Sequence, residues 1–175
     1  DGDGFFTGIV TATSFKGDGS NLTGIDSGLS SDSDGNTIGG TNAGDSITTG
    51  TNNTTLGKDA GTAITTGSSN VALGALALDA NQTGNNCTAI GADALTTNTA
   101  SGNTAVGNEA LKLNTTGAGN IAVGKNALLS NTTGNYNISV GQNSLDANTT
   151  ASNNTAIGHE ALGANTTGAQ NTAVG

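Results

Sequence analysis

The amino-acid sequence predicts an all-β fold, a parallel β-solenoid in which each coil is one repeat of about 17 residues. Two observations carry this prediction. A glycine that closes the motif Ala-Val-Gly, or a variant of it, recurs at nearly constant spacing. Within the repeat, residue type follows position, as stacked coils require.

The spacing of the repeat is nearly constant over the last two thirds of the chain. We call the glycine that closes each motif the anchor glycine. The anchor glycines are Gly57, Gly74, Gly91, Gly107, Gly124, Gly141, Gly158 and Gly175. All steps between them are equal, except that the step from Gly91 to Gly107 is one residue shorter. A weaker copy ends at Gly39, where the step to Gly57 is one residue longer than the regular one. We therefore expect about eight coils in residues 36–175.

A short strand is expected before each anchor glycine. The residue directly before the glycine is apolar and mostly β-branched, which favours a strand, and we expect its side chain to point inward. The residue two positions earlier shares that face, because side chains alternate along a strand. The residue between them is small in every copy, so a second backbone is expected to pass close to that face. These middle residues are Ala72, Ala89, Ala105, Ala122, Ser139, Ala156 and Ala173.

The second half of the repeat begins with a leucine and ends in a turn. A small residue and a leucine follow each anchor glycine, as in Ala110 and Leu111, and predict a second apolar stripe. An asparagine then opens the sequence Asn-Thr-Thr-Gly or a variant. The glycine of this turn, such as Gly117, suits a backbone position with positive φ. We therefore expect two extended arms and two turns in each coil.

A helical alternative for the Ala-Leu segments fails on length. Glycines at intervals of seven and ten residues leave no segment of the roughly 12 residues that a marginally stable helix needs. In the solenoid, repeat asparagines such as Asn103 and Asn120 are expected to stack into amide ladders. The core is nevertheless thin, because about three medium-sized apolar side chains per repeat oppose an ordering cost of about 1 to 2 kcal/mol per residue. We therefore expect a homotrimeric fibre whose copies meet on the flat alanine stripe.

Composition and charge exclude several classes of partner. The chain has a net charge of −9 and no arginine, so it cannot neutralise a run of phosphates, and we expect no nucleic acid. No apolar stretch approaches the roughly 20 residues that cross a bilayer, so we expect no membrane insertion. One cysteine, Cys87, excludes an intrachain disulfide.

Residues 1–35 lack the repeat and are expected to form a separate module. The segment from Phe5 to Phe15 is rich in β-branched and aromatic residues and predicts a strand, which a turn-rich stretch follows. We expect a short β-motif or collar, with Asp26 to Asn36 as the linker. The solenoid then occupies residues 36–175.

No pattern predicts a catalytic, cofactor-binding or metal site. The Asp-Gly segments that begin at Asp1 and Asp32 resemble parts of calcium-binding loops, but they lack a downstream bidentate glutamate and are interpreted as solvated turns. His159 takes a variable surface position beside Glu160, and Cys87 replaces a repeat asparagine. We expect no enzyme activity, because clustered carboxylates and an aromatic-lined groove are lacking. The Asn-x-Ser/Thr sequons are interpreted as turn asparagines and include Asn21, Asn114, Asn131, Asn148 and Asn165.

Two parts of the chain resemble known families. The segment from Gly8 to Ile25, GIVTATSFKGDGSNLTGI, resembles a motif of tail-fibre and other structural proteins of marine bacteriophages, notably cyanophages, where it stands beside repeats of the NTAVGxxAL kind. The repeats are also similar to the head repeats of trimeric autotransporter adhesins of the YadA type, which carry an Asn-x-x-Ala-Ile-Gly core. Those heads are trimeric left-handed parallel β-rolls. Here the unit is about 17 residues long and its asparagine lies one position nearer the glycine.

The two resemblances imply two functions. The phage motif implies a segment of a tail fibre or virion appendage that acts as a rigid trimeric spacer for host attachment and contacts neighbouring fibre or baseplate segments. The adhesin resemblance implies the alternative, a head at a bacterial cell surface that binds host or matrix. Both imply that the chain associates with itself and serves a host surface receptor.

Overall fold

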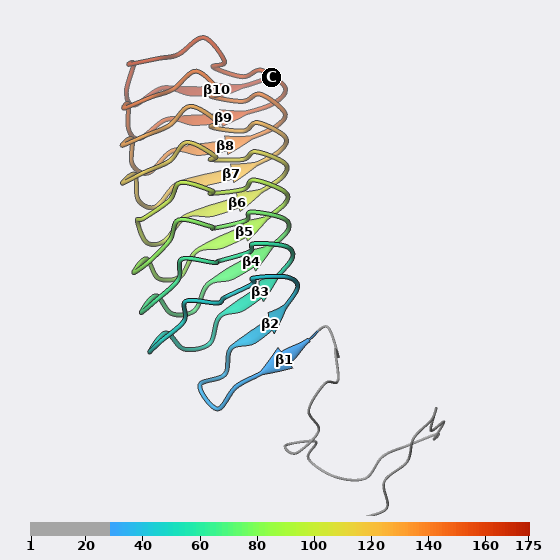
Figure 1. The fold of residues 1–175 in the computed structure, drawn as a ribbon. Coiled ribbons are helices and arrows are strands. Elements are labelled where there is room, and N and C mark those ends of the chain that lie inside the picture. The colour runs from blue at the N-terminus through green and yellow to red at the C-terminus, as the bar shows by residue number, and fades with distance from the viewer. Residues whose placement is uncertain (1–28) are drawn as a thin grey trace, which may run out of the picture.

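The computed structural model describes residues 29–175, which form a rod of stacked coils (Figure 1). All ten strands lie in one sheet, in the order in which they follow along the chain. The strands are β1 (Ser30–Ser31), β2 (Thr37–Gly39), β3 (Thr54–Leu56), β4 (Val71–Leu73), β5 (Thr88–Ile90), β6 (Thr104–Val106), β7 (Ile121–Val123), β8 (Ile138–Val140), β9 (Thr155–Ile157) and β10 (Thr172–Val174). The strand expected between Phe5 and Phe15 lies outside the described residues.

Each strand from β2 to β9 pairs in parallel with the strand of the next coil. Equivalent repeat positions are aligned, so Val71 pairs with Thr88 and Thr104 pairs with Ile121. The one shorter step keeps this alignment, because Thr88 pairs with Thr104. No helix occurs within residues 29–175. The predicted parallel β-solenoid and its repeat are confirmed.

The facing of the strand residues is the reverse of the prediction. The small middle residues point into the coil, and Ala72, Ala89 and Ala105 are completely buried. The branched residues on either side point outward, so that Leu73 keeps 42% of its surface and Ile121 keeps 40%. The coil is narrow, and the leucine of the turn already fills the space opposite the strand. Only a methyl or hydroxymethyl side chain fits beside it.

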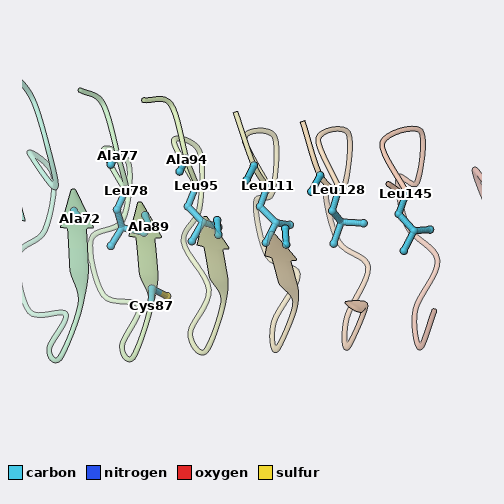
Figure 2. Packing of buried hydrophobic residues seen from close by; sticks show 14 of the residues in the cluster. Ala72, Ala77, Leu78, Cys87, Ala89, Ala94, Leu95, Leu111, Leu128 and Leu145 are labelled. Carbon is cyan, nitrogen blue, oxygen red and sulfur yellow. The ribbon is translucent and has the colours of Figure 1, made fainter. Parts of the chain in front are cut away.

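The leucine stripe is confirmed, although the second extended arm is not. Leu78, Leu95, Leu111, Leu128 and Leu145 are fully buried and stack along the rod, as Figure 2 shows for the buried cluster. Their backbones are left-handed, with φ between 49° and 55°. Each therefore lies in a turn, and each coil contributes one three-residue strand to the sheet. The adjacent coils bond to these turns directly, as in the bond from the Leu78 amide to the Ala94 carbonyl.

Glycine is required at two places in the coil for different reasons. The anchor glycines from Gly57 to Gly158, which follow β3 to β9, have φ between 131° and 137°. A Cβ on Gly124 would also lie 2.6 Å from the carbonyl oxygen of Gly141 in the next coil. The turn glycines, predicted to have positive φ, do not adopt it. Gly67 is instead required by space, since a Cβ there would lie 2.5 Å from the carbonyl oxygen of Gly84.

Buried asparagines form the predicted stacked contacts in two ladders. In the first ladder, the Oδ1 of one asparagine accepts the backbone N–H of the next asparagine at 2.9 to 3.0 Å. This ladder contains Asn36, Asn53, Asn70, Asn103, Asn120, Asn137, Asn154 and Asn171. In the second ladder, Nδ2 donates to the preceding Oδ1, as from Asn131 to Asn114 at 2.7 Å. These bonds satisfy polar groups that would otherwise be buried without partners.

The first coils fill their core with residues from different positions. Where later coils place leucine, these coils have Gly44 and Gly61, both with φ of 58°. Ile64, three residues after Gly61, occupies the space, and a Cβ on Gly61 would lie 2.8 Å from its Cδ1. The later coils have asparagine where Ile64 stands, and a small residue, mostly alanine, where Thr55 stands in β3. The exchange of three residues together therefore conserves the core volume.

This exchange predicts a compensated set of substitutions. Gly61→Leu alone overfills the coil and is expected to lower the free energy of unfolding by about 2 kcal/mol. Adding Thr55→Ala and Ile64→Asn recreates the core of the later coils and is expected to recover most of that loss. Urea unfolding of both variants measures the difference. A single variant as stable as the original chain would show that the two arrangements do not compete for one volume.

The first ladder ends on a carboxylate where the solenoid begins. Asp32 Oδ1 accepts the backbone N–H of Asn36 at 2.8 Å, the bond that an asparagine supplies in later coils. Its Oδ2 accepts the Nδ2 of Asn36, also at 2.8 Å. Strand β1 pairs antiparallel with β2 and covers the first edge of the sheet. Residues 30–36, within the expected linker, therefore form a hairpin that caps the rod.

Asp32 makes the stability of this cap depend on pH. Hydrogen bonds from the side chain and the backbone of Asn36 lower the pKa of Asp32. A carboxyl with a lowered folded pKa contributes stability that is present above its unfolded pKa and is lost as the pH falls through the folded value. We expect lower protection factors, which correct for the intrinsic pH dependence of amide exchange, in β2 but not in β7. This holds for Asp32→Ala at neutral pH and for the original chain below the lowered pKa of Asp32.

The control for this prediction is Asp34→Ala, because no other residue donates a hydrogen bond to its carboxylate within residues 29–175. It should leave the exchange of β2 unchanged. Equal effects of the two substitutions would contradict the capping role of Asp32.

Candidate functional site

The outer face of the sheet carries branched side chains along the rod. It consists of two parallel rows, one from the first and one from the last residue of each strand from β3 to β10, and we call it the aliphatic face. Its first row contains Thr54, Val71, Thr88, Thr104, Ile121, Ile138, Thr155 and Thr172, and its second row contains Leu56, Leu73, Ile90, Val106, Val123, Val140, Ile157 and Val174. No charged side chain belongs to either row. The leucine and isoleucine side chains of this face make it suited to contact another apolar surface.

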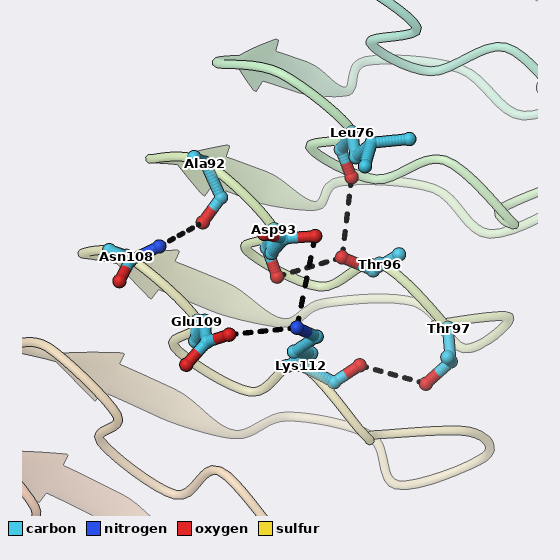
Figure 3. Close-up of polar contacts among 8 residues, drawn as sticks. All are labelled: Leu76, Ala92, Asp93, Thr96, Thr97, Asn108, Glu109 and Lys112. Atoms are coloured by element: carbon cyan, nitrogen blue, oxygen red, sulfur yellow. Dashed lines mark hydrogen bonds and ion pairs between the residues drawn. The ribbon is translucent and has the colours of Figure 1, made fainter.

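Charged residues gather along the edge of the sheet where the strands end. In the repeats from β3 onward they occupy the first, second and fifth positions after the anchor glycine, as Lys125, Glu109 and Lys112 do. Figure 3 shows the densest cluster, in which Lys112 Nζ lies 2.8 Å from Glu109 Oε1 and 3.9 Å from Asp93 Oδ1. The hydrogen bond from Lys112 lowers the pKa of Glu109, and the same bond raises the pKa of Lys112. These partly exposed ion pairs contribute little to stability, and their charges disfavour edge-to-edge association.

The opposite edge, where the strands begin, carries no charge. The turns that lead into β3 to β10 consist of residues 47–53, 64–70, 81–87, 98–103, 114–120, 131–137, 148–154 and 165–171, and they contain no Asp, Glu, Lys, Arg or His. Threonine, asparagine, serine and glycine predominate there. We call this surface the neutral edge. The rod therefore presents three surfaces of different chemistry. The aliphatic face was not expected from the sequence, because its branched side chains were predicted to point inward.

The residues singled out from the sequence are dispersed. Cys87 is buried, which raises the pKa of its thiol, and its Sγ contacts the carbonyl oxygen of Ala100 at 3.2 Å. His159 lies on the charged edge and pairs with Glu160 at 3.8 Å. Asp32 caps the first ladder and belongs to a turn, as interpreted from the sequence. Within residues 29–175, no group of three or more His, Cys, Asp and Glu residues is placed to hold a metal ion.

The sequons at Asn114, Asn131 and Asn148 fall on the second ladder. All three side chains are fully buried, and each Nδ2 donates two hydrogen bonds within the ladder and its turn. Asn165 repeats the turn bond at 2.8 Å. Asn21 lies outside the described residues. The structure therefore gives these asparagines the turn role that was inferred from the sequence.

One irregular point interrupts the ladders. Cys87 donates its backbone N–H to Asn70 Oδ1 at 2.9 Å but has no amide oxygen to continue the first ladder. Asn98 Oδ1 compensates, because it accepts Nδ2 of both Asn103 at 3.0 Å and Asn114 at 2.8 Å. The one shorter coil lies at this same point. The cysteine and the one-residue shortening of the coil are thus parts of one local adjustment.

Comparison of the chain with protein-family models, with curated proteins and with solved structures gives no match. No helix long and apolar enough to cross a bilayer occurs in residues 29–175. The surfaces of the rod are accordingly the features from which a function can be argued.

Proposed function

We propose that the chain is a segment of a phage tail fibre or related virion appendage, in which three copies form a rigid spacer for host attachment. The observation that carries the proposal is the aliphatic face. It runs along the whole rod in register, and it leaves Leu73, Ile121 and Ile157 about 40% exposed. Association of three copies on this face would bury the rows of branched side chains and supplement the thin core within each coil.

The interface proposed here differs from the one expected from sequence. The alanine stripe cannot be a contact surface, because Ala72, Ala122 and Ala156 lie inside the coil. The aliphatic face takes its place. The resemblance of Gly8 to Ile25 to the marine phage motif supports placement in a tail fibre. Neighbouring fibre or baseplate segments and a host receptor complete the proposed partners.

The spacer role is tested by removing one whole coil. Deleting residues 103–119 joins equivalent repeat positions and is expected to leave a folded rod that is shorter by about 4.8 Å. X-ray scattering in solution gives the length, and circular dichroism gives the folding. Deleting residues 103–110 alone removes part of one repeat, so equivalent positions of successive coils no longer align. This variant should unfold the neighbouring coils. Global unfolding of the in-phase variant would contradict independent stacking of the coils.

The alternative is an adhesin head at a bacterial cell surface. The repeat that begins at Asn154 reads Asn-Thr-Ala-Ile-Gly, and its resemblance to YadA-type heads favours this alternative. A solid-phase assay on immobilised collagen and fibronectin separates the two functions. The spacer is expected to leave both surfaces unbound. Saturable binding at micromolar concentration would favour the adhesin.

A further inference from the structure

Tyr136 is the one Phe, Tyr or Trp residue within residues 29–175, and its ring is mostly exposed. It lies on the neutral edge in the turn before β8 and keeps 66% of its surface exposed. Its backbone is left-handed, with φ of 56°. The equivalent positions of the two preceding coils are Gly102 and Gly119, for which such a φ is unstrained. The same left-handed conformation occurs at this repeat position in other coils, at Asn52, Ser69, Asn86, Asn153 and Gln170. The exposed aromatic ring, and not the backbone, therefore sets Tyr136 apart.

The glycines before Tyr136 leave a shelf beside its ring. A Cβ on Gly119 would lie 2.8 Å from Cδ1 of Tyr136, so the ring extends over the backbone of that coil. At Gly102, one coil further, a Cβ would meet only the amide nitrogen of Gly119 at 4.0 Å. A side chain at Gly119 would obstruct the ring, and its absence lets the ring lie on the backbone of that coil. Gly102 is exposed and leaves the backbone one coil further open to solvent.

The turns of the same part of the neutral edge carry polar side chains without hydrogen-bond partners. Thr116, Thr133 and Thr150 occupy one position of successive turns, and all three are exposed. Asn153 is the equivalent of Tyr136 in the next coil and is also exposed. Within residues 29–175, the side chains of these four residues make no hydrogen bond. Hydroxyl and amide groups are thus free to bind a ligand in the turns of the same coil as Tyr136 and of its two neighbours.

The ligand that fits this surface is neutral, hydroxylated and partly apolar. The neutral edge has no charge with which to bind an ion, whereas free hydroxyl and amide groups both donate and accept hydrogen bonds. A sugar ring presents C–H groups on one face, which stack on an aromatic ring, and hydroxyls around its rim. We propose that Tyr136 is the stacking platform of a binding site for a neutral oligosaccharide that lies along the neutral edge. This site is separate from the aliphatic face and does not depend on association of the copies.

The protein supplies its own probe for this proposal. Tyr136 is the only tyrosine and the chain has no tryptophan, so tyrosine emission reports on this ring alone. Titration of the full chain with maltohexaose, cellohexaose and mannohexaose is expected to change the emission saturably for at least one of them. No saturable change with any of the three would overturn the proposal.

Matched variants test the role of the ring. Tyr136→Phe keeps the stacking face and should bind within a few-fold of the original chain, whereas Tyr136→Gly should weaken binding about tenfold, both measured by calorimetry. Because glycine is the residue of the two preceding coils, the second variant should fold at least as stably. Blocking the shelf with Gly119→Val, whose Cβ collides with the ring, should also weaken binding. Binding unchanged in Tyr136→Gly would overturn the proposal, and light-scattering mass, measured in parallel, shows separately whether the copies associate.

Discussion

Substitution of a central anchor glycine is expected to unfold the solenoid locally or completely. In Gly124→Ala, the new Cβ would lie 2.6 Å from both the carbonyl carbon and the carbonyl oxygen of Gly141. The backbone also has φ of 135°, which side-chain-bearing residues rarely adopt. Strain and steric overlap together are expected to lower the free energy of unfolding by about 4 kcal/mol or more. Urea unfolding followed by circular dichroism measures this change.

The matched control is Gly102→Ala. Gly102 also has positive φ, 74°, but its Cβ would meet almost open space. Alanine there is expected to cost about 1 kcal/mol, the penalty of a left-handed conformation alone. If the two variants lose similar stability, the close approach of successive anchor glycines is not what the fold requires.

Introducing a charge on the aliphatic face is expected to separate the copies. Val123 lies in β7 near the middle of the rod and is 37% exposed. In Val123→Lys, an ammonium would be enclosed by apolar side chains of the neighbouring copies, at a desolvation cost that the thin interface cannot offset. The solution mass is expected to fall to 16.7 kDa, the mass of one chain, with the rod still folded.

Gln142→Lys serves as the control for that substitution. Gln142 is exposed on the charged edge, at the same repeat position as Lys125, so the variant adds the same charge away from the proposed interface. Its mass should equal that of the original chain. Dissociation by Gln142→Lys, or retention of the original mass by Val123→Lys, would show that the copies meet on another surface.

Much of the fold follows from the periodicity of the sequence. The glycine spacing predicts the coils, and the fixed position of leucine predicts the buried stripe that contains Leu111 and Leu128. The facing of the strands could not be derived in this way, because both faces of a three-residue strand carry residues compatible with burial. The outcome depends on the width of the coil, which the position of the leucine in three dimensions sets.

Other features depend on contacts between coils that a single repeat does not reveal. Ser139 and Ser144 replace alanines of the repeat, and only the structure shows the Ser139 hydroxyl donating to the Ser144 carbonyl at 2.6 Å. The same holds for Asp32, whose role as a ladder cap requires knowledge of the asparagine bonds. The sequence shows that Tyr136 stands at the repeat position that Gly102 and Gly119 occupy in the two preceding coils. Only the structure shows that the ring lies over Gly119 and stays mostly exposed.

We expect the outward-facing branched residues of the sheet to join three copies into one fibre. The mass of the original chain in solution tests it most directly. Light scattering coupled to size-exclusion chromatography at micromolar concentration is expected to give three times the chain mass of 16.7 kDa. A folded, stable species with the mass of a single chain would contradict the account.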